Sequence, residues 1–87
     1  MELITILGLV AATLTTTSFL PQVIKVIKTK HVKDLSLNMY LLLGTGILFW
    51  TIYGVFRNDL PVILANGISF ILTTIILYHI IKYKEKN

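Results

Sequence analysis

Two residues inside the long apolar stretches of this sequence are the first candidates for chemistry. Trp50 and Asn66 each lie eight positions from Asn58, in a short polar turn between two apolar stretches. If both stretches are helices, the side chains lie at matched depth, about 12 Å below the turn. An aromatic ring covers the apolar face of a sugar, and an amide hydrogen-bonds to its hydroxyls. The pair therefore suits sugar binding, and a packing tryptophan beside an asparagine bonded between helices is the alternative.

A second group of candidates lies close to the polar turn. Tyr53 and Arg57 are four residues apart on one predicted helix face, and Asp59 follows in the turn. Paired across a pore mouth, these side chains would open or close it. Anchoring of Tyr and Arg at the membrane interface is the alternative.

A proline interrupts the first apolar stretch within the run Thr15–Gln22. Pro21 cannot donate to the Thr17 carbonyl and clashes with it, so a helix should kink there. Nearby hydroxyls and the Gln22 amide can bond to some of the freed backbone groups. Such a site is either a static kink or a hinge.

The helices that position these residues are predicted from the stretches of sequence that contain no charged residue. The chain has 87 residues, 55% of them hydrophobic and 14% charged, with a mean hydropathy of +0.81. Three windows of 22 residues carry no charge, and they are Leu3–Ile24, Leu35–Phe56 and Leu60–Ile81. Each window would form about 33 Å of helix, enough for a hydrocarbon core of about 30 Å.

These windows predict an all-α membrane protein with a single domain over residues 1–87. Its three transmembrane helices are expected at about 3–27, 36–56 and 61–83. Ser36 is the expected N-cap of the second helix, and Pro61 fits the first turn of the third. The first window has no basic segment before it and no small-residue cleavage site after it, so we expect it to be retained.

Several function classes lack candidate residues. The chain has no cysteine, and His31 and His79 lie far apart, so no metal-ligand spacing exists. No nucleophile–base pair or phosphate-binding loop occurs, so we expect neither an enzyme nor a cofactor. No carboxylate lies within a predicted span, whereas ion-coupled carriers usually keep one there.

The distribution of basic residues predicts an orientation in the cell (inner) membrane. The first loop and the tail, which lie on the same side of a three-span protein, contain Lys25, Lys28, Lys30, Lys33, Lys82, Lys84 and Lys86. The opposite side has only Arg57. The positive-inside rule then puts the carboxyl terminus in the cytoplasm and the amino terminus outside. The net charge of +4 is therefore expected to face anionic lipid rather than nucleic acid.

Small residues recur every four positions on two of the predicted helices. They are Gly8, Ala12 and Thr16 on the first and Ala65, Ser69 and Thr73 on the third. Such stripes let membrane helices approach closely. The pattern alone does not separate contacts within a protomer from contacts between protomers.

An ordered set of motifs resembles a known family. Ser18–Gln22, a basic loop and then Ser36–Tyr40 closely resemble the PQ-loop signature. The whole chain is similar to the SemiSWEETs, the bacterial half-size relatives of the SWEET sugar transporters. The resemblance implies three helices packed in the order 1-3-2, and two parallel protomers that form a six-helix homodimer around a central path. It also implies facilitative transport of a mono- or disaccharide by alternating access.

The resemblance further assigns roles to individual residues. The sugar would contact Trp50 and Asn66. An outer gate would consist of Tyr53, Arg57 and Asp59, and an inner gate of Phe19, Met39 and Tyr40. The hinge would be Pro21 with Gln22.

Other functions remain open. A PQ-loop carrier of another solute, such as an amino acid, would keep the fold. A holin-like pore-forming protein would also be small and three-spanning, but it needs neither a deep Trp–Asn pair nor a Pro-Gln hinge. A passive subunit of a larger complex is a further alternative.

Overall fold

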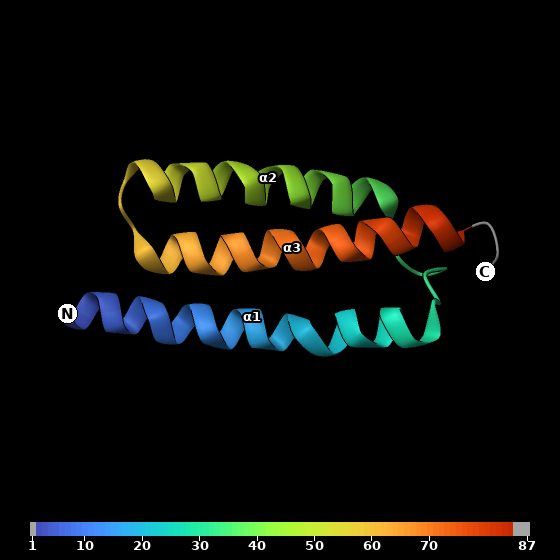
Figure 1. The fold of residues 1–87 in the computed structure, drawn as a ribbon, viewed down its shortest axis with the longest axis horizontal. Coiled ribbons are helices and arrows are strands. Elements are labelled where there is room, and N and C mark those ends of the chain that lie inside the picture. The colour runs from blue at the N-terminus through green and yellow to red at the C-terminus, as the bar shows by residue number, and fades with distance from the viewer. Residues whose placement is uncertain (1, 85–87) are drawn as a thin grey trace.

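The computed structural model describes residues 2–84 as three long helices, α1 (Leu3–Thr29), α2 (Leu37–Phe56) and α3 (Leu60–Tyr83) (Figure 1). Each is long and apolar enough to cross a membrane, with mean hydropathies of 1.9, 1.7 and 2.2. The helix ends lie within two residues of the predicted ones. Three apolar helices of this length make the chain a multi-pass membrane protein.

Helix α3 lies between the other two helices (Figure 1). It lies close to both α1 and α2, whereas the backbones of α1 and α2 do not come close to each other within residues 2–84. The expected order 1-3-2 is therefore confirmed. The short turn after Phe56 makes α2 and α3 antiparallel neighbours, and the longer loop after Thr29 crosses the end of α3 to reach the far side (Figure 1).

Side chains cap the amino ends of α2 and α3. The Ser36 hydroxyl accepts a hydrogen bond from the Met39 N–H at 3.1 Å, which confirms the predicted cap. Asp59 caps α3 in the same way, accepting from the Val62 N–H at 3.3 Å. Both bonds satisfy backbone donors that a helix start leaves free. Pro61 lies in the first turn of α3, as expected.

Most of the buried core lies toward the lysine-bearing ends of the helices. The loop residue Val32 is fully buried there, as are Ile76 and Ile80 of α3. The rest of this cluster consists of Val23, Val26, Tyr40 and Leu72. The inner half of the protomer is thus held together by packing of all three helices and the loop.

The small residues of α1 and α3 make contacts within the protomer. A Cβ placed on Gly8 would lie 2.9 Å from the Pro61 ring of α3. Thr73 of α3 is fully buried, and its methyl lies 3.5 Å from the position of a Cβ on Gly44 of α2. These two contacts show that Gly8 and Thr73 serve packing against a neighbouring helix of the same chain.

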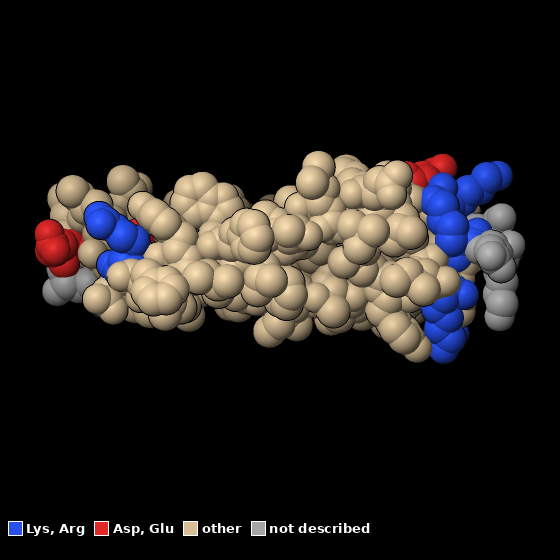
Figure 2. Space-filling model, turned by 90° about the horizontal axis from the view of Figure 1, so that it is seen from above, with Lys and Arg blue, Asp and Glu red and all other residues tan. Residues whose placement is uncertain are grey.

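Lysine side chains gather at one end of the molecule (Figure 2). That end carries the carboxyl ends of α1 and α3 and the loop between α1 and α2. Arg57 and Asp59, which flank the turn between α2 and α3, lie at the opposite end with Glu2, the N-cap of α1. Lys86, which the charge argument also counts, lies outside the described residues.

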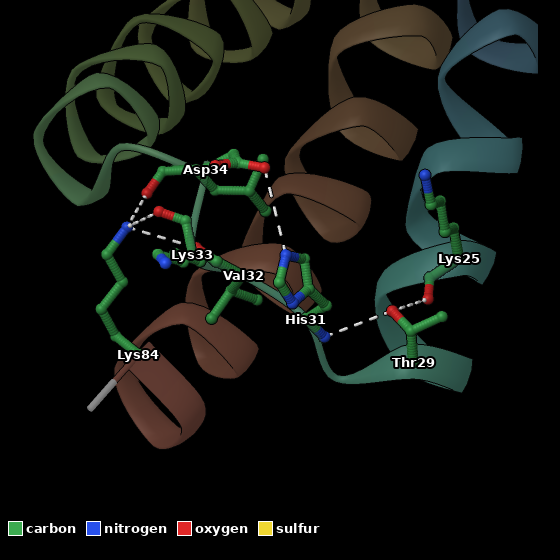
Figure 3. A network of polar contacts seen from close by, with 8 residues as sticks. Lys25, Thr29, His31, Val32, Lys33, Asp34 and Lys84 are labelled. Atoms are coloured by element: carbon green, nitrogen blue, oxygen red, sulfur yellow. Dashed lines mark hydrogen bonds and ion pairs between the residues drawn. The ribbon is translucent and has the colours of Figure 1, made fainter. Parts of the chain in front are cut away.

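A lysine of α3's carboxyl end holds the inner loop in place (Figure 3). The Lys84 ammonium donates to the carbonyls of Val32 at 3.2 Å, of Lys33 at 2.9 Å, and of Leu35. On the other side of the loop, the His31 N–H donates to the Thr29 hydroxyl at 3.2 Å. Together with the buried Val32 side chain, these bonds join the loop to the ends of α1 and α3.

Candidate functional site

One face of α2 and its C-cap carry four of the ten predicted site residues. Successive members are four, three, four, three and four positions apart, and they are Met39, Leu43, Gly46, Trp50, Tyr53 and Arg57. This spacing puts them on one side of a helix. We call this face the α2 stripe. Its large side chains are about half exposed in the isolated protomer, including Met39, Trp50 and Tyr53 at 50%, 55% and 51%.

Trp50 and Asn66 border the same hollow. It has a volume of about 540 Å³, and the remaining lining residues are Met39, Leu42, Leu43, Gly46 and Ile47. Asn66 reaches it from α3, whereas the other lining residues belong to α2. The structure thus brings together the aromatic ring and the amide, which lie on different helices, in a space of the size that small-molecule sites usually have.

The Asn66 amide is only partly used within the protomer. Its nitrogen donates to the Val62 carbonyl, one turn back on α3, at 3.0 Å. The side chain makes no other hydrogen bond within residues 2–84. Its carbonyl oxygen and its second N–H are therefore available to a ligand hydroxyl.

The Trp50 ring borders a second hollow on the side nearer the polar turn. That space measures about 500 Å³ and is lined by Gly46, Phe49, Trp50 and Tyr53. The Trp50 and Tyr53 rings meet edge to face, with centroids 5.4 Å apart and planes at 82°. This contact orients the indole and leaves open space on either side of it along the helix.

Tyr53, Arg57 and Asp59 gather at the end of the molecule opposite the lysines. No ion pair joins Arg57 to Asp59 within residues 2–84. Asp59 instead caps α3. A hollow of about 410 Å³ lies between this turn and the start of α1, and it is bordered by Arg57, Asn58, Asp59 and Gly8, among others. Any pairing that closes a mouth here has to involve a second chain or a different conformation.

Pro21 lies inside α1, which continues past it to Thr29 without a break (Figure 1). Two of the hydroxyls nearby bond to their own helix one turn back, whereas the buried Thr16 hydroxyl has no partner within the described residues. Ser18 donates to the Thr15 carbonyl at 2.7 Å, and Thr15 donates to the Ala11 carbonyl at 3.1 Å. None of these bonds reaches the Thr17 carbonyl, which Pro21 deprives of its helical donor. Gln22 is exposed beside the proline.

The three predicted inner-gate residues do not share one environment. Met39 lies on the α2 stripe and borders the Trp50 hollow. Tyr40 is 4% exposed and belongs to the buried core, against which Phe19 also packs. A side chain that closes a path against a second protomer must be exposed on the isolated one. Met39 meets this condition in the present conformation, and Tyr40 does not.

Gly46 is one of the lining residues that the sequence reasoning missed, together with Leu42, Ile47 and Phe49. It borders both hollows together with Trp50. Its position four residues before Trp50, and seven after Met39, placed it on the same helix face. A glycine on a stripe of large side chains was the available signal.

Fold and site together define a three-span membrane protein with an aromatic–amide hollow at the junction of two helices. Residues 3–63 match the PQ loop repeat family. A relative from Leptospira biflexa named "Sugar transporter SemiSWEET" is 51% identical over 82 residues, with 94% of each chain covered. One of the same name from Bradyrhizobium diazoefficiens is 41% identical over 81 residues, covering 93% of this chain and 94% of its own.

Two solved structures have the same fold. The first, described as SemiSWEET in the inward-open conformation, has a TM-score of 0.92 at 36% identity, covering 99% of this chain and 92% of that one. The second, a bacterial homologue of SWEET transporters, has a TM-score of 0.86 at 41% identity, covering 94% and 99%. The chain belongs to the PQ-loop family, within its half-size SemiSWEET group. The two relatives described above are named as transporters, which fits the expectation that it is not an enzyme.

Proposed function

We propose that the protein is a facilitative transporter of small sugars. The observation that carries the proposal is the hollow of about 540 Å³ in which Trp50 of α2 faces the same space as Asn66 of α3. The ring offers a flat apolar face, and the amide has one acceptor and one donor to spare. The names of the relatives, which are sugar transporters, support a sugar as the solute.

Uniport is the proposed mode of transport. The charge-free windows over all three helices leave no carboxylate at depth to carry a proton or a sodium ion. A sugar would then move down its own gradient, and the protein would need only to expose the hollow to each side in turn.

The working unit is proposed to be a parallel homodimer. The Trp50 hollow is bounded by α2 and α3 alone and stays open on its remaining side. A second copy facing the α2 stripe would close it and would bury the half-exposed Trp50 and Tyr53. Arg57 and Asp59 do not pair within one protomer, so the outer gate would form where the two copies meet.

Alternating access is proposed to depend on two gates, one at each end of the path. The outer gate would consist of Tyr53, Arg57 and Asp59. At the inner end, Met39 would close the path, with Phe19 and Tyr40 supporting it from the protomer core. Pro21, with Gln22 beside it, would be the hinge about which the inner part of α1 moves.

The proposed orientation places the lysine-bearing end in the cytoplasm of the cell (inner) membrane. Six lysines lie at that end within the described residues, and Arg57 is the basic residue at the other. The asymmetry supports a cytoplasmic carboxyl terminus and an external amino terminus.

Counterflow in proteoliposomes tests the function. Purified protein should exchange a labelled sugar against the same unlabelled sugar, saturably and without a proton or sodium gradient. Exchange of amino acids but not sugars would point to another PQ-loop carrier. Release of every small solute would point to a holin-like pore, and no movement of any solute would contradict a transport role for the chain by itself.

A further inference from the structure

One face of α3 changes from apolar to cationic as it reaches the end of the molecule where lysines gather (Figure 2). Ile71 and Tyr78 are 60% and 55% exposed, and Lys82 follows one turn after Tyr78. These three side chains point within about 40° of one another around the helix. We call this face the α3 ridge. It lies about 120–160° around α3 from Asn66, so it is separate from the proposed sugar site.

Aromatic rings hold the Lys82 ammonium in place. It donates to the Tyr78 hydroxyl at 3.2 Å. It also lies 5.5 Å from the centroid of the Tyr78 ring and 5.4 Å from that of the Tyr83 ring. A cation within about 6 Å of an aromatic face is attracted to it. The Lys30 ammonium, at the end of α1, lies 5.8 Å from the same Tyr83 ring, so two helices place positive charge beside one ring.

The depth and the charge of this cluster fit the phosphate of a lipid. Lys82 lies about 33 Å along α3 from Leu60, so it reaches headgroup level when α3 spans a hydrocarbon core of about 30 Å. An ammonium has three N–H groups, so Lys82 can donate to a further acceptor besides Tyr78. The inner loop, the helix ends beside it and the tail contain seven lysines but only two acidic residues, Asp34 and Glu85. This excess of positive charge attracts anionic lipid.

We propose that the α3 ridge binds an anionic phospholipid. The lipid phosphate accepts hydrogen bonds from the Lys82 ammonium and the Tyr78 hydroxyl, next to the second positive charge of Lys30. An acyl chain runs along Tyr78 and Ile71, which are both more than half exposed. The ridge is thus cationic at headgroup level and apolar toward the middle of the membrane, which matches the order of phosphate and chains in a lipid.

Titration of the purified protein with lipid tests the site. Phosphatidylglycerol, or zwitterionic phosphatidylcholine with the same acyl chains, is added to the protein in detergent, and native mass spectrometry gives the dissociation constant of the first bound lipid. The wild type should bind phosphatidylglycerol more tightly than phosphatidylcholine. Lys82→Met should weaken phosphatidylglycerol binding about fivefold, the scale of one lysine near a membrane surface. Tyr78→Phe should weaken it about two- to tenfold, the scale of one lost hydrogen bond.

Lys84→Met is the matched control. It removes the same charge from the same end of α3, but the Lys84 ammonium is already bonded to carbonyls of the inner loop. Phosphatidylglycerol should bind this variant as tightly as it binds the wild type. An equal loss of affinity in Lys84→Met and Lys82→Met would overturn the proposal, because diffuse positive charge would then account for the binding.

Three other results would also overturn the proposal. Equal affinity of the wild type for the two lipids would mean that no anionic headgroup is selected. Unchanged phosphatidylglycerol affinity in both Lys82→Met and Tyr78→Phe would mean that the lipid binds elsewhere. Glycerol phosphate, which has the phosphate but no acyl chains, should not displace bound phosphatidylglycerol at the same concentration. Displacement would mean that the cluster binds a soluble phosphate compound and not a lipid.

Discussion

Trp50 is a large aromatic residue with open space on two sides in the isolated protomer. Tryptophan at depth in a membrane usually packs against neighbours or lies at the interface. Here the ring is 55% exposed and has Tyr53 as its aromatic partner. Exposure of such a ring next to the partly unpaired Asn66 amide is unexplained by packing within the protomer, and it is what a sugar site requires.

Removal of either member of the pair should abolish most of the uptake. Trp50→Ala takes away the stacking face, and Asn66→Ala takes away the amide. Each lost contact is worth about 1–3 kcal/mol, or roughly tenfold to a hundredfold in affinity. Phe56→Ala is the control, because this aromatic of the same helix is 82% exposed and borders neither hollow of Trp50. Near-normal uptake by both site variants would indicate that Trp50 and Asn66 serve helix packing and not sugar binding.

Asp59 has two tasks that different substitutions separate. Its carboxylate caps α3 through the Val62 N–H, and its charge is proposed to pair with Arg57 of a second copy. Asp59→Asn keeps a capping oxygen and removes the charge, whereas Asp59→Ala removes both. We expect uptake to fall in both variants. Thermal stability should fall only in Asp59→Ala, by about 0.5–2 kcal/mol for a lost cap.

The proposed gate role also predicts a change in thiol reactivity in the same two variants. A single cysteine at Thr5, which borders the outer hollow, should react faster with an external thiol reagent when the charge of Asp59 is gone. The chain has no cysteine of its own, so the reaction reports that position alone. Equal reactivity in the wild type and in Asp59→Asn would argue against a gate at this end.

At the scale of the elements, α2 and α1 differ in exposure and in packing. The α2 stripe presents Met39, Trp50 and Tyr53 on one exposed face. Helix α1 has α3 as the one helix running close beside it within the described residues, and it contains the proline. A helix with one packing partner and a weakened backbone ladder is the element with the least resistance to bending. This is why we assign the movement to α1.

Pro21 should therefore matter through flexibility. Pro21→Ala restores an N–H for the Thr17 carbonyl and removes a penalty of up to about 3 kcal/mol, so α1 should stiffen. Pro21→Gly keeps the helix weak at that point. Uptake should rank wild type first, then glycine, then alanine, and the alanine variant should melt at a higher temperature. If alanine transports like the wild type and glycine does not, Pro21 supplies a fixed shape and not a hinge.

Lys84 should govern the order of the inner loop. Lys84→Met keeps the apolar stem and removes the ammonium that bonds to three loop carbonyls. Lys84 is exposed and water competes for these bonds, so the loss should be about 0.5–1 kcal/mol. Amide exchange of residues 31–36 should then become about two- to fivefold faster. Lys82→Met is the control, since Lys82 bonds to the Tyr78 hydroxyl and not to the loop. Equal exchange rates in both variants would contradict the tether.

The sequence predicted the elements better than the contacts between them. Helix ends and the Ser36 cap depend on local composition and were within two residues of the structure. The hydrogen bonds of Lys84 to the loop join residues about fifty positions apart, and no local sequence pattern predicts such a bond. The burial of Tyr40 in the core likewise depends on how the loop residue Val32 and α3 fold over it. Gly46 was not predicted because site residues were sought among side chains that can bond or stack, and a glycine has no such side chain.

At the scale of the whole molecule, the protomer has a packed end and an open end. The buried cluster joins α1, α2, α3 and the loop at the lysine-bearing end. The hollows next to Trp50 and next to Arg57 lie nearer the other end or at mid-length. A single protomer thus leaves the large side chains of the α2 stripe about half exposed. In a membrane this face requires a cover that excludes lipid from a sugar path.

The cover is predicted to be a second copy, and single cysteines can detect it. The chain has no cysteine, so Tyr53→Cys places one thiol on the α2 stripe, where two parallel copies should bring the same residue close to their common axis. Val55→Cys is the control, because it lies about 200° around the helix from Tyr53 and is similarly exposed, at 53%. In lipid vesicles, a short bifunctional thiol reagent should link the Tyr53→Cys variant into pairs and leave the Val55→Cys variant single. Links through Val55 alone would mean that the copies meet on another face. Transport by a protein that stays monomeric in the bilayer would show that one chain forms the path without a partner, and it would contradict the proposed dimer.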